Sequence, residues 1–250
     1  MDLSERGASA ARHPWEHARS TFFRRLIADS VDLAHLERLL DIGAGDGWFA
    51  QELLADLPES TSVTCWDTYY TSDDLNALLP PRIERTLARP GGQFGCLLLM
   101  DVLEHIEHDE EFLADTVVPL LSDDGVLIFS VPAHPRLFSR HDTALGHHRR
   151  YRPAAISALL RRHLDVTSEG SLFSSLTVAR LGQVAVERLG HPAAAPSEGE
   201  HGIGQWEHGS LITKAVTTVL DGDARLARVL ARRNRSIPGL SYWAVCRPNR

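Results

Sequence analysis

The sequence predicts an α/β protein built on a mostly parallel β-sheet. Between residues 37 and 173, short apolar runs alternate with segments of helical periodicity. A glycine-rich turn joins the first apolar run to a helix, and the runs FGCLLLMDV and DGVLIFSVPA are continuous enough for strands buried on both faces. With 250 residues, of which 43% are hydrophobic, the chain can bury the core of one domain with additions, or of at most two small domains.

The elements follow in a regular order. Residues 11–30 are expected to form an amphipathic helix, because Trp15, Phe22, Phe23 and Leu26 share one face. The next elements expected are a strand in LERLLDI, a helix after the glycine turn, strands in SVTCWD, RIERTLA and FGCLLLMDV, a helix in DEEFLADTVVPLL, a strand in DGVLIFSVPA and a helix in PAAISALLRRH. Acidic residues in the first turn of DEEFLADTVVPLL and Pro153 at the start of PAAISALLRRH suit helix N-termini.

The chain divides into four predicted regions. They are an N-terminal helical cap (1–36), the sheet core (37–173), a mainly helical insertion that forms much of the substrate pocket (174–240) and a final strand (241–250) in LSYWAVCRP. Within the insertion, the polar stretch 191–209 is rich in Gly, Pro and Ala and is expected to be mobile.

Composition limits the classes of function. A formal net charge of −7 argues against a nucleic-acid-binding surface, which needs basic residues to neutralise phosphates. Cys65, Cys96 and Cys246 are scattered and lack CxxC spacing, so we expect reduced thiols and a cytoplasmic location. We identify no secretory signal and no apolar run near the ~20 residues that span a bilayer, whereas peripheral membrane contact stays open.

The glycine turn LLDIGAGDGWFA indicates a particular ligand. Gly43, Gly45 and Gly47 let the backbone adopt positive φ and approach a ligand, and the helix that follows presents free amides. The G-x-G-x-G spacing differs from the G-x-G-x-x-G of dinucleotide enzymes, since Trp48 stands where the third glycine would fall. Asp41 would repel a pyrophosphate but suits an amine.

A second acid completes this pattern. Asp67 lies twenty residues after Gly47 at the end of the second strand, where a carboxylate can bind both hydroxyls of a ribose. A ligand with a ribose, an ammonium group and no phosphate is S-adenosylmethionine (SAM).

These residues support a family resemblance. LLDIGAGDG resembles the glycine motif of class I, Rossmann-like SAM-dependent methyltransferases, and LLLMDVLEHIEHDEEFL with DGVLIFSVPA resembles their type-11 branch, which includes quinone-biosynthesis enzymes. The pattern D-x-x-x-G-H-x-R-R-Y, from Asp142 to Tyr151, and the segment IPGLSYWAVCRP resemble one bacterial subgroup. The resemblance covers residues 13–173 and 236–248. It implies a seven-strand, mostly parallel Rossmann-like sheet with a mainly helical insertion before the last strand.

The resemblance also implies roles for individual residues. The methionine end of SAM would be lined by Asp41, Gly43, Ala44, Gly45 and Gly47. Asp67 would hold the ribose, whereas Met100, Asp101 and Val102 would border the cofactor and the transferring methyl group. Trp15 and Arg19 would close over the pocket. RTLARPGGQ offers no acid for the adenine amine, so the adenine contact stays unassigned.

The segment HDTALGHHRRYRP, residues 141–153, gathers three histidines and three arginines after the fifth strand, where open α/β sheets bind ligands. It could be a solvated basic loop, a metal site, a nucleic-acid patch or part of a substrate pocket. A metal site would use His141, His147, His148 and His134. We expect no metal, because no cysteine is near and adjacent histidines point apart. The acidic chain, and strand four ending in MDVLEH, disfavour an enzyme acting on nucleic-acid bases.

The substrate-pocket interpretation matches the chemistry of methyl transfer, which needs an acceptor held close to the methyl group and a base to remove its proton. His141 or His147 would be the base, Arg149 and Tyr151 would orient an anionic acceptor, and His105 is a further candidate. The predicted function is O- or C-methylation of a small organic molecule, anionic or lipophilic. The alternatives are a SAM-binding regulatory module without turnover and a nicotinamide-dependent oxidoreductase, which the glycine spacing disfavours.

Overall fold

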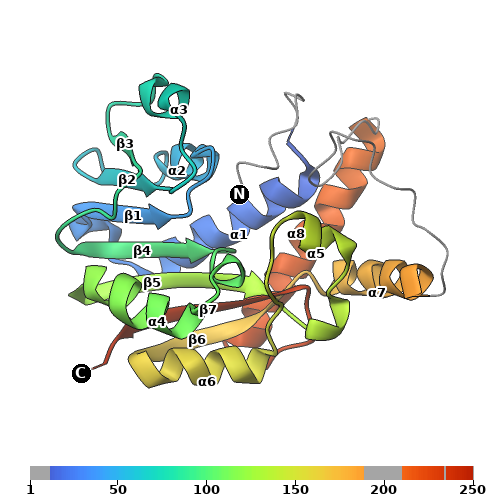
Figure 1. Ribbon diagram of the computed structural model, residues 1–250. Helices are drawn as coiled ribbons and strands as arrows, with labels where there is room; N and C mark the ends of the chain where they lie inside the picture. The colour runs from blue at the N-terminus through green and yellow to red at the C-terminus, as the bar shows by residue number, and fades with distance from the viewer. Residues whose placement is uncertain (1–11, 189–209, 234, 250) are drawn as a thin grey trace.

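The computed structural model describes residues 12–188, 210–233 and 235–249. Seven strands form one sheet in the order β3-β2-β1-β4-β5-β7-β6 (Figure 1). Strand β7 is antiparallel to both neighbours, and the other paired strands are parallel. The predicted seven-strand, mostly parallel Rossmann-like fold is confirmed.

The bounds of the elements are close to those expected for most of the core. The strands are β1 (Arg38–Ile42), β2 (Ser62–Trp66), β3 (Ile83–Thr86), β4 (Phe94–Met100), β5 (Leu121–Pro132), β6 (Leu164–Leu172) and β7 (Ser241–Pro248). The helices are α1 (Pro14–Ser30), α2 (Trp48–Leu53), α3 (Ser72–Asn76), α4 (Asp109–Glu111), α5 (Arg140–Ala144), α6 (Pro153–His163), α7 (Ser174–Arg188) and α8 (Ser210–Ala231).

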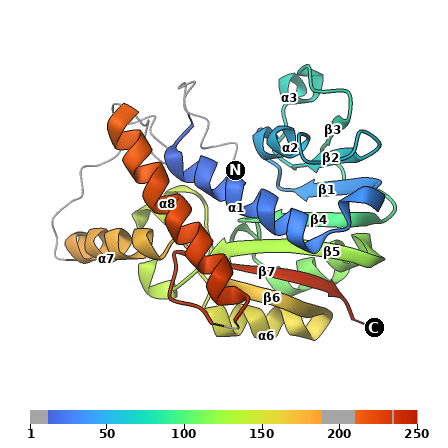
Figure 2. The same ribbon diagram turned by 180° about the vertical axis from the view of Figure 1, so that it is seen from behind.

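Two helical layers cover the sheet. Helices α1 and α8 pack against each other on one face (Figure 2), where Phe22 and Phe23 of α1 and Leu220 of α8 share a core with Trp243 of β7. On the opposite face, α6 buries Ile156 and Leu160. The sheet is therefore buried on both faces, as its continuous apolar strands require.

The helix after β4 and strand β6 differ from the expectation, and the short helices α3 and α5 were not among the expected elements. The helix predicted in DEEFLADTVVPLL is α-helical only over α4 and continues as a π-helical turn, Phe112–Val117, and a 3-10 turn, Val118–Leu120. Pro119 has no backbone N–H to donate, which favours a short irregular ending. Strand β6 lies in a segment whose sequence pattern did not mark a strand.

The helical insertion is described only in part. Its polar stretch 191–209, expected to be mobile, lies outside the described residues. Helix α8 packs on the sheet and α1, and in the described parts of the insertion only α7 and the segment before β7 contribute side chains to the main cavity. None of the helices in the described ranges combines the length and apolarity needed to cross a bilayer.

Candidate active site

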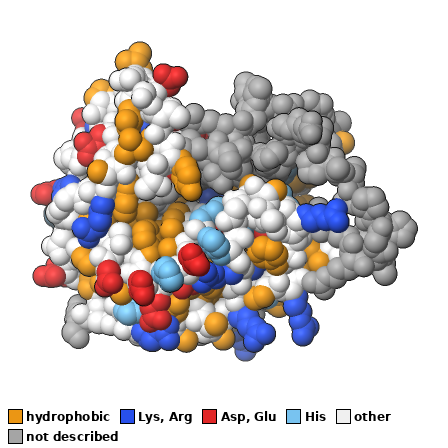
Figure 3. All heavy atoms as spheres, viewed as in Figure 1, with side chains coloured by type: hydrophobic (Ala, Val, Ile, Leu, Met, Phe, Trp, Pro, Cys, Tyr) orange, Lys and Arg blue, Asp and Glu red, His pale blue; other side chains and the backbone are white. Residues whose placement is uncertain are grey.

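A cavity of about 380 Å³ lies at the carboxyl ends of β1, β4 and β5. This volume is in the range of small-molecule sites, and the position is where open α/β sheets bind ligands. Figure 3 shows histidine, acidic and basic side chains gathered near the centre of one face, beside a band of hydrophobic side chains. The lining comes from α1, the glycine turn and the start of α2, the turn after β4, the segment 132–150, α7 and residues 240–241.

The glycine turn has the geometry that its sequence predicts. Gly43, Gly45 and Gly47 all adopt positive φ, at +67°, +57° and +73°. A Cβ atom on Gly43 would lie 2.5 Å from Cγ2 of Val102, so this turn and the turn after β4 approach each other too closely for a side chain. Gly43 and Ala44 line the cavity, whereas Gly45, Gly47 and Val102 do not.

Asp41, at the end of β1, lines the cavity but is only 3% exposed. Among the described residues, its carboxylate has no hydrogen-bond or ion-pair partner. Burial raises the pKa of Asp41 to about 7. A cation placed here would stabilise the ionised carboxylate, so the site fits the ammonium group of an amino acid ligand.

Asp67 is placed directly behind the glycine turn. Its carboxylate accepts hydrogen bonds from the backbone N–H groups of Gly45 and Tyr69, each at 2.9 Å. Asp67 is buried and does not line the cavity. It therefore holds the turn in shape, and its predicted contact with a ribose stays a prediction.

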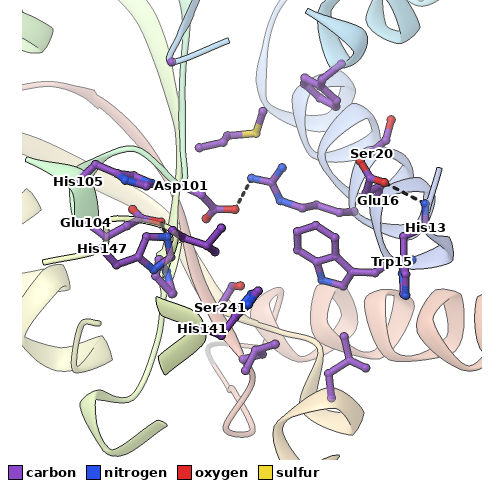
Figure 4. A pocket seen from close by; sticks show the side chains of 18 of the residues that line it. His13, Trp15, Glu16, Ser20, Asp101, Glu104, His105, His141, His147 and Ser241 are labelled. Atoms are coloured by element: carbon purple, nitrogen blue, oxygen red, sulfur yellow. Dashed lines mark hydrogen bonds and ion pairs between the residues drawn. The ribbon is translucent and has the colours of Figure 1, made fainter. Parts of the chain in front are cut away.

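Helix α1 forms the opposite wall (Figure 4). Trp15 and Arg19 both line the cavity, and Arg19 forms an ion pair of 2.6 Å with Asp101. Asp101 adopts φ +58° and also accepts a hydrogen bond of 3.0 Å from the hydroxyl of Ser130. Together with Met100, which also lines the cavity, these contacts fix the end of β4 against α1.

Asp142 organises the histidine and arginine cluster. This fully buried carboxylate pairs with Nδ1 of His147 at 3.2 Å, Nε of Arg150 at 2.6 Å and a guanidinium nitrogen of Arg180 at 3.1 Å. Burial by itself would raise the pKa of Asp142, but the hydrogen bond from His147 and the charge of Arg150 hold it below its ordinary value. Asp142 therefore remains an anion that orients three side chains at the cavity.

Two of the predicted acceptor residues lie elsewhere, and their expected role is corrected here. Arg149 pairs with Asp109 at 3.1 Å and donates to the carbonyl of Glu107, outside the cavity. The hydroxyl of Tyr151 donates to Asp109 at 2.8 Å, and burial followed by this bond raises the pKa of Tyr151 above its ordinary value. Both side chains tie the segment to α4 instead of facing a substrate.

The two predicted base candidates, His141 and His147, both line the cavity, as does His105. Burial, followed by the charge of Arg180, lowers the pKa of His141, so its ring is neutral at pH 7 and able to accept a proton.

Arg150, Arg180 and Glu104 are among the lining residues that the sequence reasoning missed or assigned otherwise. Arg150 takes the place expected of Arg149, and Arg180 projects from α7 one turn after Leu176, which also lines the cavity. Glu104 is fully buried, and neither of its carboxylate oxygens has a hydrogen-bond partner among the described residues. Burial, then the charge of Asp101, raises the pKa of Glu104 well above its ordinary value. The available signal was an acid within the apolar run LLLMDVLEHI.

The fold and the cavity define a Rossmann-like domain of the kind found in class I methyltransferases. Residues 13–177 match a family described as "Methyltransferase domain". Because the match covers more than half of the chain, the protein belongs to this methyltransferase-domain family. No curated protein matches the sequence.

Solved structures with this fold have diverse names. The [4+2]-cyclase SpnF is 15% identical with a TM-score of 0.56, and the match covers 96% of this chain and 85% of that one. The cyclopropane synthase MmaA2 from Mycobacterium tuberculosis is 16% identical, with a TM-score of 0.53 and coverage of 90% and 83%. Coclaurine N-methyltransferase, bound to N-methylheliamine and SAH, is 14% identical, with a TM-score of 0.52 and coverage of 91% and 70%. At these identities the likeness shows the fold alone.

Proposed function

We propose that the protein is a SAM-dependent methyltransferase that methylates a small organic acceptor at oxygen or carbon. One observation carries this proposal: a single cavity joins Asp41 and the glycine turn to the basic cluster around Asp142. A donor bound at the first half would meet an acceptor bound at the second. We also propose that the chain falls in the type-11 branch and in the bacterial subgroup with the D-x-x-x-G-H-x-R-R-Y pattern.

The residues of the first half fit SAM. Asp41 offers a buried carboxylate to the ammonium group, and the glycine turn allows close backbone approach. Asp67, whose carboxylate accepts hydrogen bonds from the backbone N–H groups of Gly45 and Tyr69, is the residue that we assign to binding the ribose. Trp15 and Arg19 line the site from α1. When bound, SAM supplies an electrophilic methyl group.

The second half is suited to an acceptor that must lose a proton. His141, neutral because of its burial, is the base that we assign to a hydroxyl or acidic carbon. Arg150 and Arg180 both line the cavity beside Asp142, and we assign these two guanidinium groups to an anionic acceptor. Leu145 and Leu176 add apolar contact.

The alternatives need a direct test, because one protein with this fold is named a cyclase. Calorimetric titration with SAM and with NADH, combined with a methyl-transfer assay over small phenolic, enolic and carboxylate acceptors, separates the cases. We expect SAM to bind, NADH not to bind, and methyl groups to appear on an acceptor. Binding of SAM without transfer to any acceptor would favour a regulatory module, and binding of NADH alone would favour an oxidoreductase.

The location and the partners that we propose are based on the cysteines and on the net charge. The three cysteines are free and buried, which supports a reducing compartment such as the cytoplasm. The partner that we propose is a small-molecule acceptor, not a nucleic acid, since the formal net charge is −7.

A further inference from the structure

A carboxylate and two imidazole rings lie close together at the wall of the cavity, and no hydrogen bond from a described residue reaches the carboxylate. Glu104, His105 and His147 each place one potential ligand atom so that all three lie within 4.8 Å of one another. Figure 4 shows the three side chains together, across the cavity from Trp15. Glu104 is fully buried, and both its oxygens lack a hydrogen-bond partner among the described residues. A buried carboxylate in this state needs a proton or a cation.

The orientation of His147 favours a cation. Its Nδ1 atom lies 3.2 Å from Asp142, which is held as an acceptor by Arg150 and Arg180. The proton of a neutral ring therefore lies on Nδ1, and the lone pair of Nε2 faces Oε1 of Glu104. These two atoms are 4.0 Å apart, which is too long for a shared proton in a hydrogen bond.

We propose that Glu104, His105 and His147 bind a divalent cation of the zinc or cobalt type. Two imidazoles and one carboxylate are a common ligand set for Zn²⁺, and a fourth position would open to the cavity. Bonds of about 2.1 Å place tetrahedral ligands about 3.4 Å apart, so binding would draw the side chains slightly together. Asp142 would serve as the outer carboxylate that fixes the ring of a metal-bound histidine.

The expectation of no metal considered only His134 and the histidines of segment 141–153. The structure brings Glu104 and His105 next to His147, so two ligands are adjacent in the sequence and the third comes from a distant segment. His148 is exposed and takes no part, although its backbone N–H donates to the carbonyl of Glu104.

The proposal deepens the proposed function, on which this step rests. The fourth position would face the part of the cavity assigned to the acceptor. A cation there would select acceptors that offer an oxygen ligand, such as a phenol or an enol, over purely apolar ones, and would lower the pKa of the hydroxyl.

The test is a titration of the untagged, metal-stripped full chain with Co²⁺. We expect one equivalent to bind by calorimetry, with visible ligand-field absorption of a four- or five-coordinate site. Glu104→Gln, which keeps the side-chain volume, and His147→Ala should each weaken binding at least ~10-fold. The matched control His148→Ala should bind like the parent. Equal affinity in Glu104→Gln and the parent, or no binding by the parent, would overturn the site.

Two further measurements keep the outcomes distinct. Urea unfolding shows whether each variant is folded, and His105→Ala, on the cavity wall, replaces any variant that is not. SAM titration without metal tests the proposed function separately. Co²⁺ binding without SAM binding would support the cation site and contradict the proposed methyltransferase function. SAM binding without Co²⁺ binding would contradict only the cation site.

Discussion

The carboxylate of Asp41 lies at the end of β1, 3% exposed, with a pKa raised by burial from 3.8 to about 7. The folded state holds this proton more tightly than the unfolded chain does. The stability that the group contributes is therefore complete at low pH and is lost as the pH rises from about 4 to about 7.

Binding of SAM should reverse this preference. The ammonium group favours the ionised carboxylate, so we expect binding at pH 6 to release a proton and affinity to rise with pH up to about 7. Calorimetry at pH 6 in phosphate and in imidazole buffer, which differ in ionisation enthalpy, should give different binding enthalpies for the parent and a much smaller difference for Asp41→Asn. The same enthalpy in both buffers for the parent would contradict this account.

Asp67 gives a second residue-level prediction. Asp67→Ala should weaken SAM binding by about 1.5–3 kcal/mol, the range for a hydrogen bond with a charged group. Because Asp67 also accepts from Gly45, Asp67→Asn serves as a partner variant that retains one acceptor oxygen for the turn. Unchanged calorimetric affinity in folded Asp67→Ala would remove this residue from the ribose site.

Loss of the proposed base, His141, and loss of the proposed anion-binding residue, Arg150, should change different kinetic constants. His141→Ala should lower kcat by about 10²–10⁴-fold with SAM affinity nearly intact, as expected for loss of a general base. Arg150→Ala should instead raise KM for an anionic acceptor, because it removes binding shared by the ground and transition states. The matched control is Arg149→Ala, whose side chain lies outside the cavity. A larger KM effect at Arg149 than at Arg150 would show that the cluster has been assigned the wrong way round.

Arg149 and Arg150 show which property of single residues the sequence could not predict, namely which of two adjacent side chains faces the cavity. The residue types and the position after the fifth strand were predictable. In the structure, Tyr151 pairs with Ala133 in an isolated β-bridge, and neighbouring side chains of extended backbone point to opposite sides. That pairing decides which arginine faces the cavity, and no local pattern encodes it.

Helix α8 belongs to the insertion that was expected to form much of the substrate pocket. In the structure it packs against α1 and the sheet and does not line the cavity. Leu220→Ala should destabilise the protein by about 2–5 kcal/mol, because Leu220 is 1% exposed in the core between α8, α1 and the sheet. The neighbouring control Val219→Ala, 58% exposed, should change stability by less than about 0.5 kcal/mol. Urea unfolding measures both, and equal small effects would mean that α8 is not a core helix.

Elements with one strong signal were predictable, and those with mixed signals were not. Strands β4 and β5 are continuous apolar runs, and β1 leads into an unusual glycine turn. Strand β6 is an edge strand in which buried and exposed residues alternate only over residues 164–167, and it includes Asp165, Ser168 and Glu169. Its polar positions match an exposed face, and only its pairing with β7 identifies it as a strand.

At the scale of the whole molecule, the sheet order explains why distant segments form one site. Strands β1 and β4 are neighbours although about fifty residues separate them, and β5 lies beside β4. Their carboxyl ends therefore bring the glycine turn, the turn after β4 and the segment after β5 to one edge. The sequence indicated each of these three segments, whereas the contribution of α7 follows from tertiary packing alone.

The place of β7 affects how the chain is made. Its residues are synthesised after those of the other six strands, yet they form hydrogen bonds with β5 on one side and β6 on the other. Until then, the edge of β5 has no partner, and β6 cannot join the sheet. During synthesis the chain therefore carries an open apolar edge that could pair with other chains. The complete sheet cannot form until residues 241–248 have been synthesised, and a nascent chain stalled before residue 241 should depend on chaperones to stay free of aggregation.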